Sequence, residues 1–61
     1  MDWTETTFLD WPCWESGPFR IMEVNSYYEL FFDKGIATDV WQFRSLEEAK
    51  EKAEHVRINP D

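Results

Sequence analysis

A lone cysteine and a lone histidine constrain this short chain more than any other feature of its sequence. Cys13 has no second cysteine with which to form an internal disulfide, and Cys13 with His55 supplies only two of the four ligands of a structural zinc site. A chain of 61 residues buries only about 60% of the surface that its unfolded form exposes, so its core is thin. Stability must therefore come from aromatic packing, with 18% of the residues Phe, Trp or Tyr, or from a partner chain.

The charge is strongly one-sided. Thirteen acidic and six basic side chains give a net charge of −7, which repels nucleic-acid phosphates and anionic lipid headgroups. Direct binding to nucleic acid or to a membrane is disfavoured. No apolar run approaches the ~20 residues of a membrane span, and residues 1–16 lack the basic start and apolar stretch of a signal peptide. We therefore expect a cytoplasmic protein.

The clearest predicted element is a helix that begins after Ser45. The segment Ser45-Leu46-Glu47-Glu48 matches a capping box, in which the Ser hydroxyl and the Glu carboxylate satisfy opposite backbone donors. Helix-favouring composition continues to Arg57, and Asn59-Pro60 ends the helix with Asn59 in a left-handed cap. The apolar positions share one narrow stripe: Leu46, Ala49, Ala53 and Val56.

Two runs rich in aromatic and branched residues, 19–24 and 27–33, predict a β-hairpin with Asn25-Ser26 as its two-residue turn. That turn fixes which side chains share a face. The face under the helix then carries Phe19, Ile21, Tyr28, Leu30 and Phe32. A third strand is expected at 40–44. Its Trp41 and Phe43 join the same face only if the preceding loop holds an even number of residues.

Residues 1–16 form an acidic, Trp-rich arm before this meander. Within the arm, residues 6–11 are the candidate for a fourth strand, and residues 11–14 are expected to form an irregular turn. The predicted fold is α+β: a three-stranded antiparallel sheet, four-stranded if the arm contributes, with one C-terminal helix packed on one face. A single domain of residues 1–61 is expected, divided into the arm 1–16, the β-meander 17–44, the helix 45–57 and the tail 58–61.

One helix covers only one face of such a sheet, so the opposite face poses a problem. Contiguous exposed apolar patches of more than a few hundred Å² are uncommon on soluble monomers. Three covers are open: the Trp-rich arm folded back over the face, a second copy forming a homodimer, or another protein. The residues of this possible dimer face are Met22, Val24, Tyr27, Phe31 and Val40.

The sequence contains few residues that could form a catalytic site. Cys13 and His55 lie in the arm and in the last helical turn, with no spacing that brings a nucleophile to a base. The two glycines stand apart, so no glycine-rich phosphate loop is present. A domain of this size also encloses little of the cleft that paired carboxylates need. We expect no enzyme, no cofactor and no metal site.

Acidic residues offer a binding surface instead. Glu47, Glu51 and Glu54 lie at i, i+4 and i+7 of the helix, a negative row that could imitate a phosphate backbone. The ordinary alternative is a solvated helix face with the i, i+4 pairs Glu48–Lys52 and Lys50–Glu54. The arm adds acidic and aromatic side chains suited to a basic protein groove: Asp10, Trp11, Trp14 and Glu15.

The three-strand and helix order, with the segment 43–54 (FRSLEEAKEKAE), resembles many small proteins encoded by bacteriophages and prophages. The resemblance covers residues 17–57. Several acidic members bind and block host enzymes that act on nucleic acid, among them RNA polymerase, restriction and CRISPR nucleases and uracil-DNA glycosylase. The last strand and helix also resemble a double-stranded RNA-binding domain, but Glu47 and Glu48 replace that family's basic helix start.

The sequence thus leads to two functional hypotheses. The first is a non-catalytic, acidic binding protein of phage type that inhibits or modulates a basic host protein through a nucleic-acid-mimicking surface. The alternative is a small homodimeric structural or accessory protein that pairs through its open sheet face.

Overall fold

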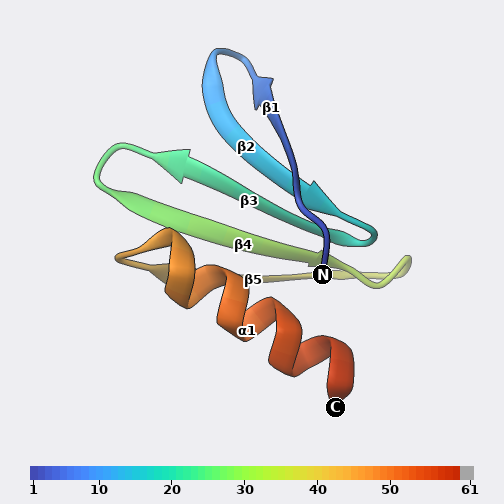
Figure 1. The fold of residues 1–61 in the computed structure, drawn as a ribbon. Coiled ribbons are helices and arrows are strands. Elements are labelled where there is room, and N and C mark those ends of the chain that lie inside the picture. The colour runs from blue at the N-terminus through green and yellow to red at the C-terminus, as the bar shows by residue number, and fades with distance from the viewer. Residues whose placement is uncertain (60–61) are drawn as a thin grey trace.

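The computed structural model describes residues 1–59, which form a five-stranded antiparallel sheet followed by one helix (Figure 1). Each strand pairs with the next strand in the sequence. The elements are β1 (Thr4–Phe8), β2 (Trp11–Ser16), β3 (Phe19–Val24), β4 (Tyr27–Asp33), β5 (Thr38–Phe43) and α1 (Leu46–Ile58). The predicted α+β class with a C-terminal helix is confirmed, whereas the expected three or four strands were too few.

The predicted register of β3 against β4 is confirmed, and the structure supplies the register of β5, which the sequence left open. Val24 pairs with Tyr27 across the two-residue turn, which sets Ile21 opposite Leu30. The connection between β4 and β5 is residues 34–37, an even number, and it places Trp41 opposite Leu30 on the same face. The third strand begins and ends slightly earlier than the predicted range 40–44.

The arm is not a loop that folds back over the sheet. Its residues form the β1–β2 hairpin, with Phe8 paired to Trp11 across a turn at Leu9 and Asp10. Both turn residues have positive φ, 52° and 70°, as the twist of a type I′ hairpin turn requires. The predicted strand at residues 6–11 therefore straddles this turn, and the arm lengthens the sheet by two strands.

Residues 11–14 are part of β2 rather than an irregular turn. Ser16 pairs with Phe19 across a turn at Gly17 and Pro18. Every second residue of β2, counted back from Ser16, therefore directs its backbone N–H and C=O toward β3, and Pro12 is one of these residues. The β2–β3 pairing ends at Cys13, one residue after Pro12, so the missing N–H of the proline costs no bond to β3.

The core lies between the sheet and α1. The helix stripe contributes Ala49, Ala53 and Val56, and the strands contribute Phe19, Ile21 and Leu30, all of which are buried as predicted. Half-buried side chains pack around them, including the predicted Tyr28, Phe32 and Leu46. Trp3, Trp14 and Trp41 also pack against this cluster, so three of the four tryptophans reinforce the helix side of the sheet.

Both ends of α1 differ in detail from the expectation. At the start, the Ser45 hydroxyl oxygen accepts a bond from the Glu48 N–H at 3.2 Å. The Glu48 carboxylate accepts from that same hydroxyl at 3.1 Å rather than from a backbone donor. At the end, the helix runs to Ile58, and Asn59 has φ −126° rather than a left-handed conformation. Pro60, the expected terminator, lies outside the described residues.

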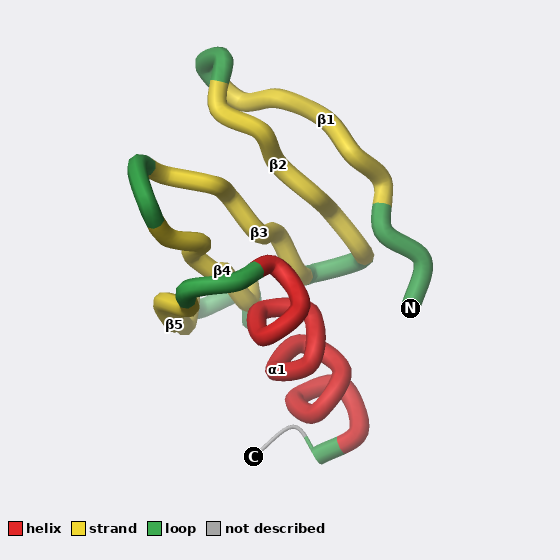
Figure 2. The backbone as a smooth tube through the Cα atoms, turned by 60° about the vertical axis from the view of Figure 1, so that its left-hand side comes forward, coloured by secondary structure: helices red, strands yellow, loops and turns green. Residues whose placement is uncertain are grey.

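The sheet is strongly curled. Helix α1 contacts β3, β4 and β5, while the β1–β2 hairpin extends beyond it (Figure 2). The guanidinium carbon of Arg20 on β3 lies 5.7 Å from the centre of the Phe8 ring on β1, although β2 runs between them. The hairpin therefore curls toward the face opposite the helix.

Candidate functional site

The two faces of the sheet form the candidate binding surfaces. We call the side on which α1 packs the helix-bearing face, and the other side the uncovered face. Strand alternation assigns every strand residue to one of them.

On the helix-bearing face, an aromatic pair lies where the helix does not reach. The ring centres of Trp14 on β2 and Tyr28 on β4 are 6.1 Å apart, with a tilt of 54°. Glu5 of β1 pairs with Trp14, and Glu23 of β3 pairs with Tyr28, so a carboxylate flanks each ring. Neither glutamate was among the predicted partner-binding residues. The predicted β3–β4 register already set Glu23 opposite Tyr28, whereas the face of Glu5 depends on the register of β1.

The outer side of α1 carries further carboxylates. Glu47 and Glu51 are exposed and form no ion pair among residues 1–59. Glu54, the third member of the predicted row, is bonded to Arg57 and lies 3.6 Å from the amino group of Met1. The Arg57 hydrogen bond lowers the pKa of Glu54, which keeps that carboxylate charged but engaged within the chain.

Neither of the expected i, i+4 pairs, Glu48–Lys52 and Lys50–Glu54, forms an ion pair in the described part of the chain. The ammonium of Lys52 lies instead 5.2 Å from the centre of the Trp41 ring. The ion pair within this helix is Glu54–Arg57, and Glu47 and Glu51 are open to solvent.

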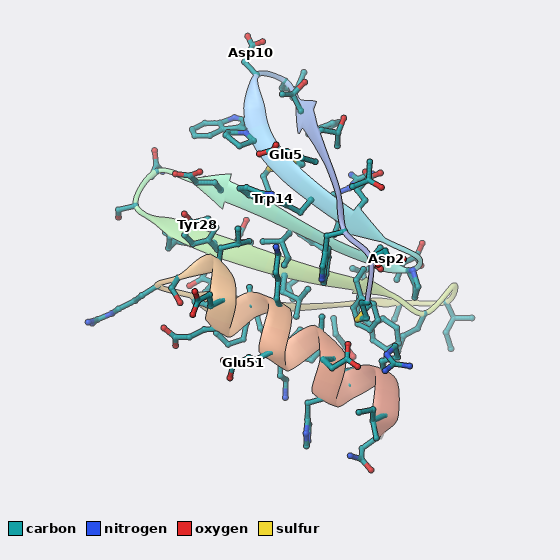
Figure 3. The ribbon with its side chains drawn as sticks, in the orientation of Figure 1. Asp2, Glu5, Asp10, Trp14, Tyr28 and Glu51 are labelled. Atoms are coloured by element: carbon teal, nitrogen blue, oxygen red, sulfur yellow. The ribbon has the colours of Figure 1, made fainter. Side chains whose placement is uncertain are left out.

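In Figure 3, Glu5 lies near Trp14, Asp2 lies near the start of the chain, and Glu51 lies on the far side of α1 from the Trp14–Tyr28 pair. We define the acidic surface as Glu5, Glu23, Glu47 and Glu51. Among residues 1–59, none of these four side chains has an ion pair or a side-chain hydrogen bond within the chain.

The structure divides the predicted partner-binding residues between locations. Trp14, Glu47, Glu51 and Glu54 lie on the side of the helix. Trp11 and Glu15 lie on the uncovered face, and Asp10 lies at the tip of the β1–β2 turn, where Figure 3 shows it pointing away from the sheet. The predicted partner-binding residues therefore do not share one surface. They lie on the side of the helix, on the uncovered face and at the tip of the first hairpin.

The residues of the predicted dimer face, in contrast, do share one face. Met22, Val24, Tyr27 and Phe31 are half-buried and Val40 is 48% exposed, all on the uncovered face. Phe8 and Trp11 add exposed aromatic surface from the hairpin. A groove of about 470 Å³ crosses this face, lined among others by Phe8, Arg20, Met22 and Phe31.

Arg20 holds the curled hairpin over this groove. Its guanidinium lies 2.8 Å from the Glu15 carboxylate and packs against the Phe8 ring. The pair is nearly half exposed, so its electrostatic contribution is small, and its role is to position the Phe8 ring beside the groove.

Cys13 and His55 lie far from a catalytic arrangement. Cys13 is buried on the uncovered face of β2, and its thiol donates a weak hydrogen bond to the Trp11 carbonyl at 3.5 Å. His55 is exposed on α1, on the other side of the sheet. Burial raises the pKa of the Cys13 thiol, only partly opposed by the nearby Arg20 charge. A raised pKa disfavours the nucleophilic thiolate.

This burial has a measurable consequence for stability. The unfolded chain loses the thiol proton at a lower pH than the folded chain, so the free energy of unfolding should fall as pH rises above about 8.5. This fall should be absent in Cys13→Ala, and any pH dependence of stability that remains in the variant comes from other groups. Urea titrations at a series of pH values test this, and an equal pH dependence in both proteins would contradict a perturbed thiol.

Within residues 1–59, no three His, Cys, Asp or Glu side chains are grouped so that they could hold a metal ion. No helix in that range is both long and apolar enough to cross a membrane. Comparison with known proteins gives no match to a protein-family model, to a curated protein or to a solved structure.

Proposed function

We propose that this chain is a non-catalytic binding protein that engages a basic protein partner through the acidic surface. The observation that carries the proposal is a set of four carboxylates that have no partner within residues 1–59: Glu5 and Glu23 beside the Trp14–Tyr28 pair, and Glu47 and Glu51 on the outer side of α1. Lys and Arg side chains of a partner suit both the carboxylates and the faces of the rings.

The resemblance to small acidic phage proteins extends this proposal to the kind of partner. A host enzyme that acts on nucleic acid carries a basic groove for the phosphate backbone. The acidic surface would occupy that groove in the cytoplasm and so inhibit the enzyme. Glu47 and Glu51, about 6 Å apart along the helix axis at 1.5 Å per residue, take the place of neighbouring phosphates.

Charge reversal on α1 tests the proposal. The double variant Glu47→Lys, Glu51→Lys should weaken binding to a basic partner by about tenfold or more, because two attractive contacts become repulsive. Wild-type binding should itself weaken with added salt. A deca-arginine peptide serves as a defined first probe, with titrations followed by amide and indole NMR shifts. The wild-type shifts should concentrate at Glu5, Glu23, Glu47, Glu51 and the indole of Trp14.

A matched control comes from the uncovered face. Glu29→Gln removes a carboxylate that accepts a hydrogen bond from Gln42 at 3.3 Å and should leave peptide binding unchanged within about twofold. The same proteins, immobilised on beads, identify the natural partner as the protein retained by wild type and Glu29→Gln but lost by the double variant. Equal binding by all three proteins would contradict the proposal.

A further inference from the structure

Strand β5 is one of the two free edges of the sheet. It pairs with β4 on one side, and α1 lies against it on the helix-bearing face, but no other element of residues 1–59 lies beside it. Its pairing with β4 runs without a bulge from Thr38 to Phe43. The sheet therefore ends at an unbroken strand.

One hydrogen bond shows which backbone groups of β5 point outward. The Lys34 N–H donates to the Ala37 carbonyl at 2.9 Å, so Ala37 and every second residue after it turn their backbone groups toward β4. The residues between them turn theirs out of the sheet: Thr38, Val40 and Gln42. Among residues 1–59, no turn, loop or side-chain hydrogen bond reaches these six N–H and C=O groups.

β5 also lacks the usual features by which edge strands avoid pairing. Such strands carry Pro, Lys or a bulge, or are very short. β5 has six residues (TDVWQF) with no Pro, no Lys and no bulge. Its one charged side chain, Asp39, is paired with Lys34 at 3.1 Å. The other edge, β1, is one residue shorter, and its two-residue turn directs outward only the backbone groups of Glu5 and Thr7.

The side chains along β5 favour a particular kind of added strand. On the uncovered side, Val40 is 48% exposed. On the helix-bearing side, the Lys52 ammonium lies 5.2 Å from the centre of the half-buried Trp41 ring, and it has no ion pair within residues 1–59. A carboxylate opposite Trp41 would lie beside this ammonium. The carboxylates of Glu29 and Asp33 belong to β4, about 10 Å from an added strand at about 4.8 Å per strand.

We infer that the outer edge of β5 binds an extended segment of a partner protein as a sixth, antiparallel strand. Such a strand exchanges two hydrogen bonds with each residue at a hydrogen-bonded position, which satisfies the outward groups of Thr38, Val40 and Gln42. The segment carries an acidic residue opposite Trp41 and a β-branched residue opposite Val40. This site does not include the acidic surface, so the inference and the proposed function stand or fall separately.

Amide NMR shifts caused by a defined hexapeptide test the inference. The probe is acetyl-STEVST-amide, whose Glu and Val lie opposite Trp41 and Val40 in an antiparallel register. A peptide of this length should bind with a dissociation constant of about 1 mM, so it is titrated to about 5 mM. The shifts should concentrate at Thr38, Val40 and Gln42. Shifts confined to other elements, or no shifts, would overturn the inference.

Val40→Pro gives a sharper test, because it deletes one outward N–H. That N–H makes no bond to β4, so proline at this edge position leaves the pairing of β4 and β5 intact. The peptide affinity should fall by about fivefold or more, since one hydrogen bond is lost. Gln42→Pro deletes a second outward N–H and should have the same effect. The amide spectrum of each variant checks that it is folded.

The matched control is Thr7→Pro on the other edge. Phe8 and Trp11 close a two-residue turn, so the N–H of Thr7 likewise points out of the sheet. This variant should bind the peptide within about twofold of wild type, because no contact at β5 changes. Equal weakening by Val40→Pro and Thr7→Pro would contradict a site at β5. Concentration-dependent shifts of β5 without peptide would also contradict the inference, since they would identify a second copy as the occupant.

Lys52→Gln tests the acidic residue of the added strand. The affinity for acetyl-STEVST-amide should fall by about twofold to threefold, because an exposed ion pair contributes little. The affinity for acetyl-STAVST-amide, which lacks the carboxylate, should not change. An equal loss for both peptides would show that Lys52 does not recognise the carboxylate.

Discussion

Leu30→Ala should remove about half of the free energy of unfolding at 25 °C. Leu30 is fully buried at the centre of the sheet, between Ile21 on β3 and Trp41 on β5. Truncating a buried leucine costs about 2–5 kcal/mol, because apolar contact is lost and a cavity remains. A chain of 61 residues has a total stability of only about 3–9 kcal/mol. Urea denaturation followed by tryptophan fluorescence measures the loss.

Leu9→Ala provides the same chemical change at a solvent-exposed position. Leu9 lies in the β1–β2 turn and is 77% exposed, so its truncation should change the free energy of unfolding by less than about 0.5 kcal/mol. If both variants lost the same stability, the packing of α1 against β4 described above would be wrong.

Ala53→Leu should be the second most damaging substitution. Ala53 is fully buried where α1 packs on the sheet, and a leucine there forces added carbon atoms between the two layers. Overpacking of this kind costs about 1–3 kcal/mol, while leucine and alanine have similar helix propensities. The helix should separate from the sheet, and the midpoint of urea unfolding should fall.

The control for this substitution is Ala37→Leu. Ala37 lies in the exposed β4–β5 connection, where only its carbonyl makes a bond, to the Lys34 N–H at 2.9 Å. That variant should unfold at the wild-type midpoint within about 0.5 kcal/mol. A stable Ala53→Leu protein with an unchanged midpoint would show that the helix lies farther from the sheet than the structure places it.

The central hairpin was predictable because its turn determines its register. With only Asn25 and Ser26 between the strands, the alternation of Phe19 and Ile21 with Arg20 and Met22 assigns each side chain to a face. The apolar stripe of α1 was equally easy to predict, since Ala49 and Ala53 are four residues apart and so lie on one side of a helix. These local patterns gave the helix-side core correctly.

The first hairpin was not predictable from such patterns. Its turn at Leu9 and Asp10 lacks the Gly or Asn that usually marks a type I′ turn, yet both residues have positive φ. Pro12 also argues against a paired strand, because proline has no N–H to donate. It is tolerated in β2 because the pairing of β2 with β3 ends at Cys13. Without these strands, the faces of Trp11 and Trp14 could not be assigned.

The candidate surfaces were predictable only where the strands that carry them were predictable. The predicted dimer face holds together because four of its residues belong to β3 and β4, whose register was derived from the turn, and because the four-residue connection to β5 places Val40 on the same face. The predicted partner-binding set was divided because four of its members, Asp10, Trp11, Trp14 and Glu15, belong to the first hairpin. Glu54 differs from Glu47 and Glu51 because it contacts the amino group of the distant Met1 together with Arg57.

The meander order of the sheet has a kinetic consequence. Each strand pairs with its predecessor through a connection of two to four residues, so most strand contacts are local in sequence. Short loops close in well under a microsecond and hairpins form in about 1–10 µs. The docking of α1 on the sheet and the contact of Glu54 with the Met1 amino group join more distant parts of the chain. The protein should therefore fold within milliseconds, faster than all-β barrels whose strands pair across long loops.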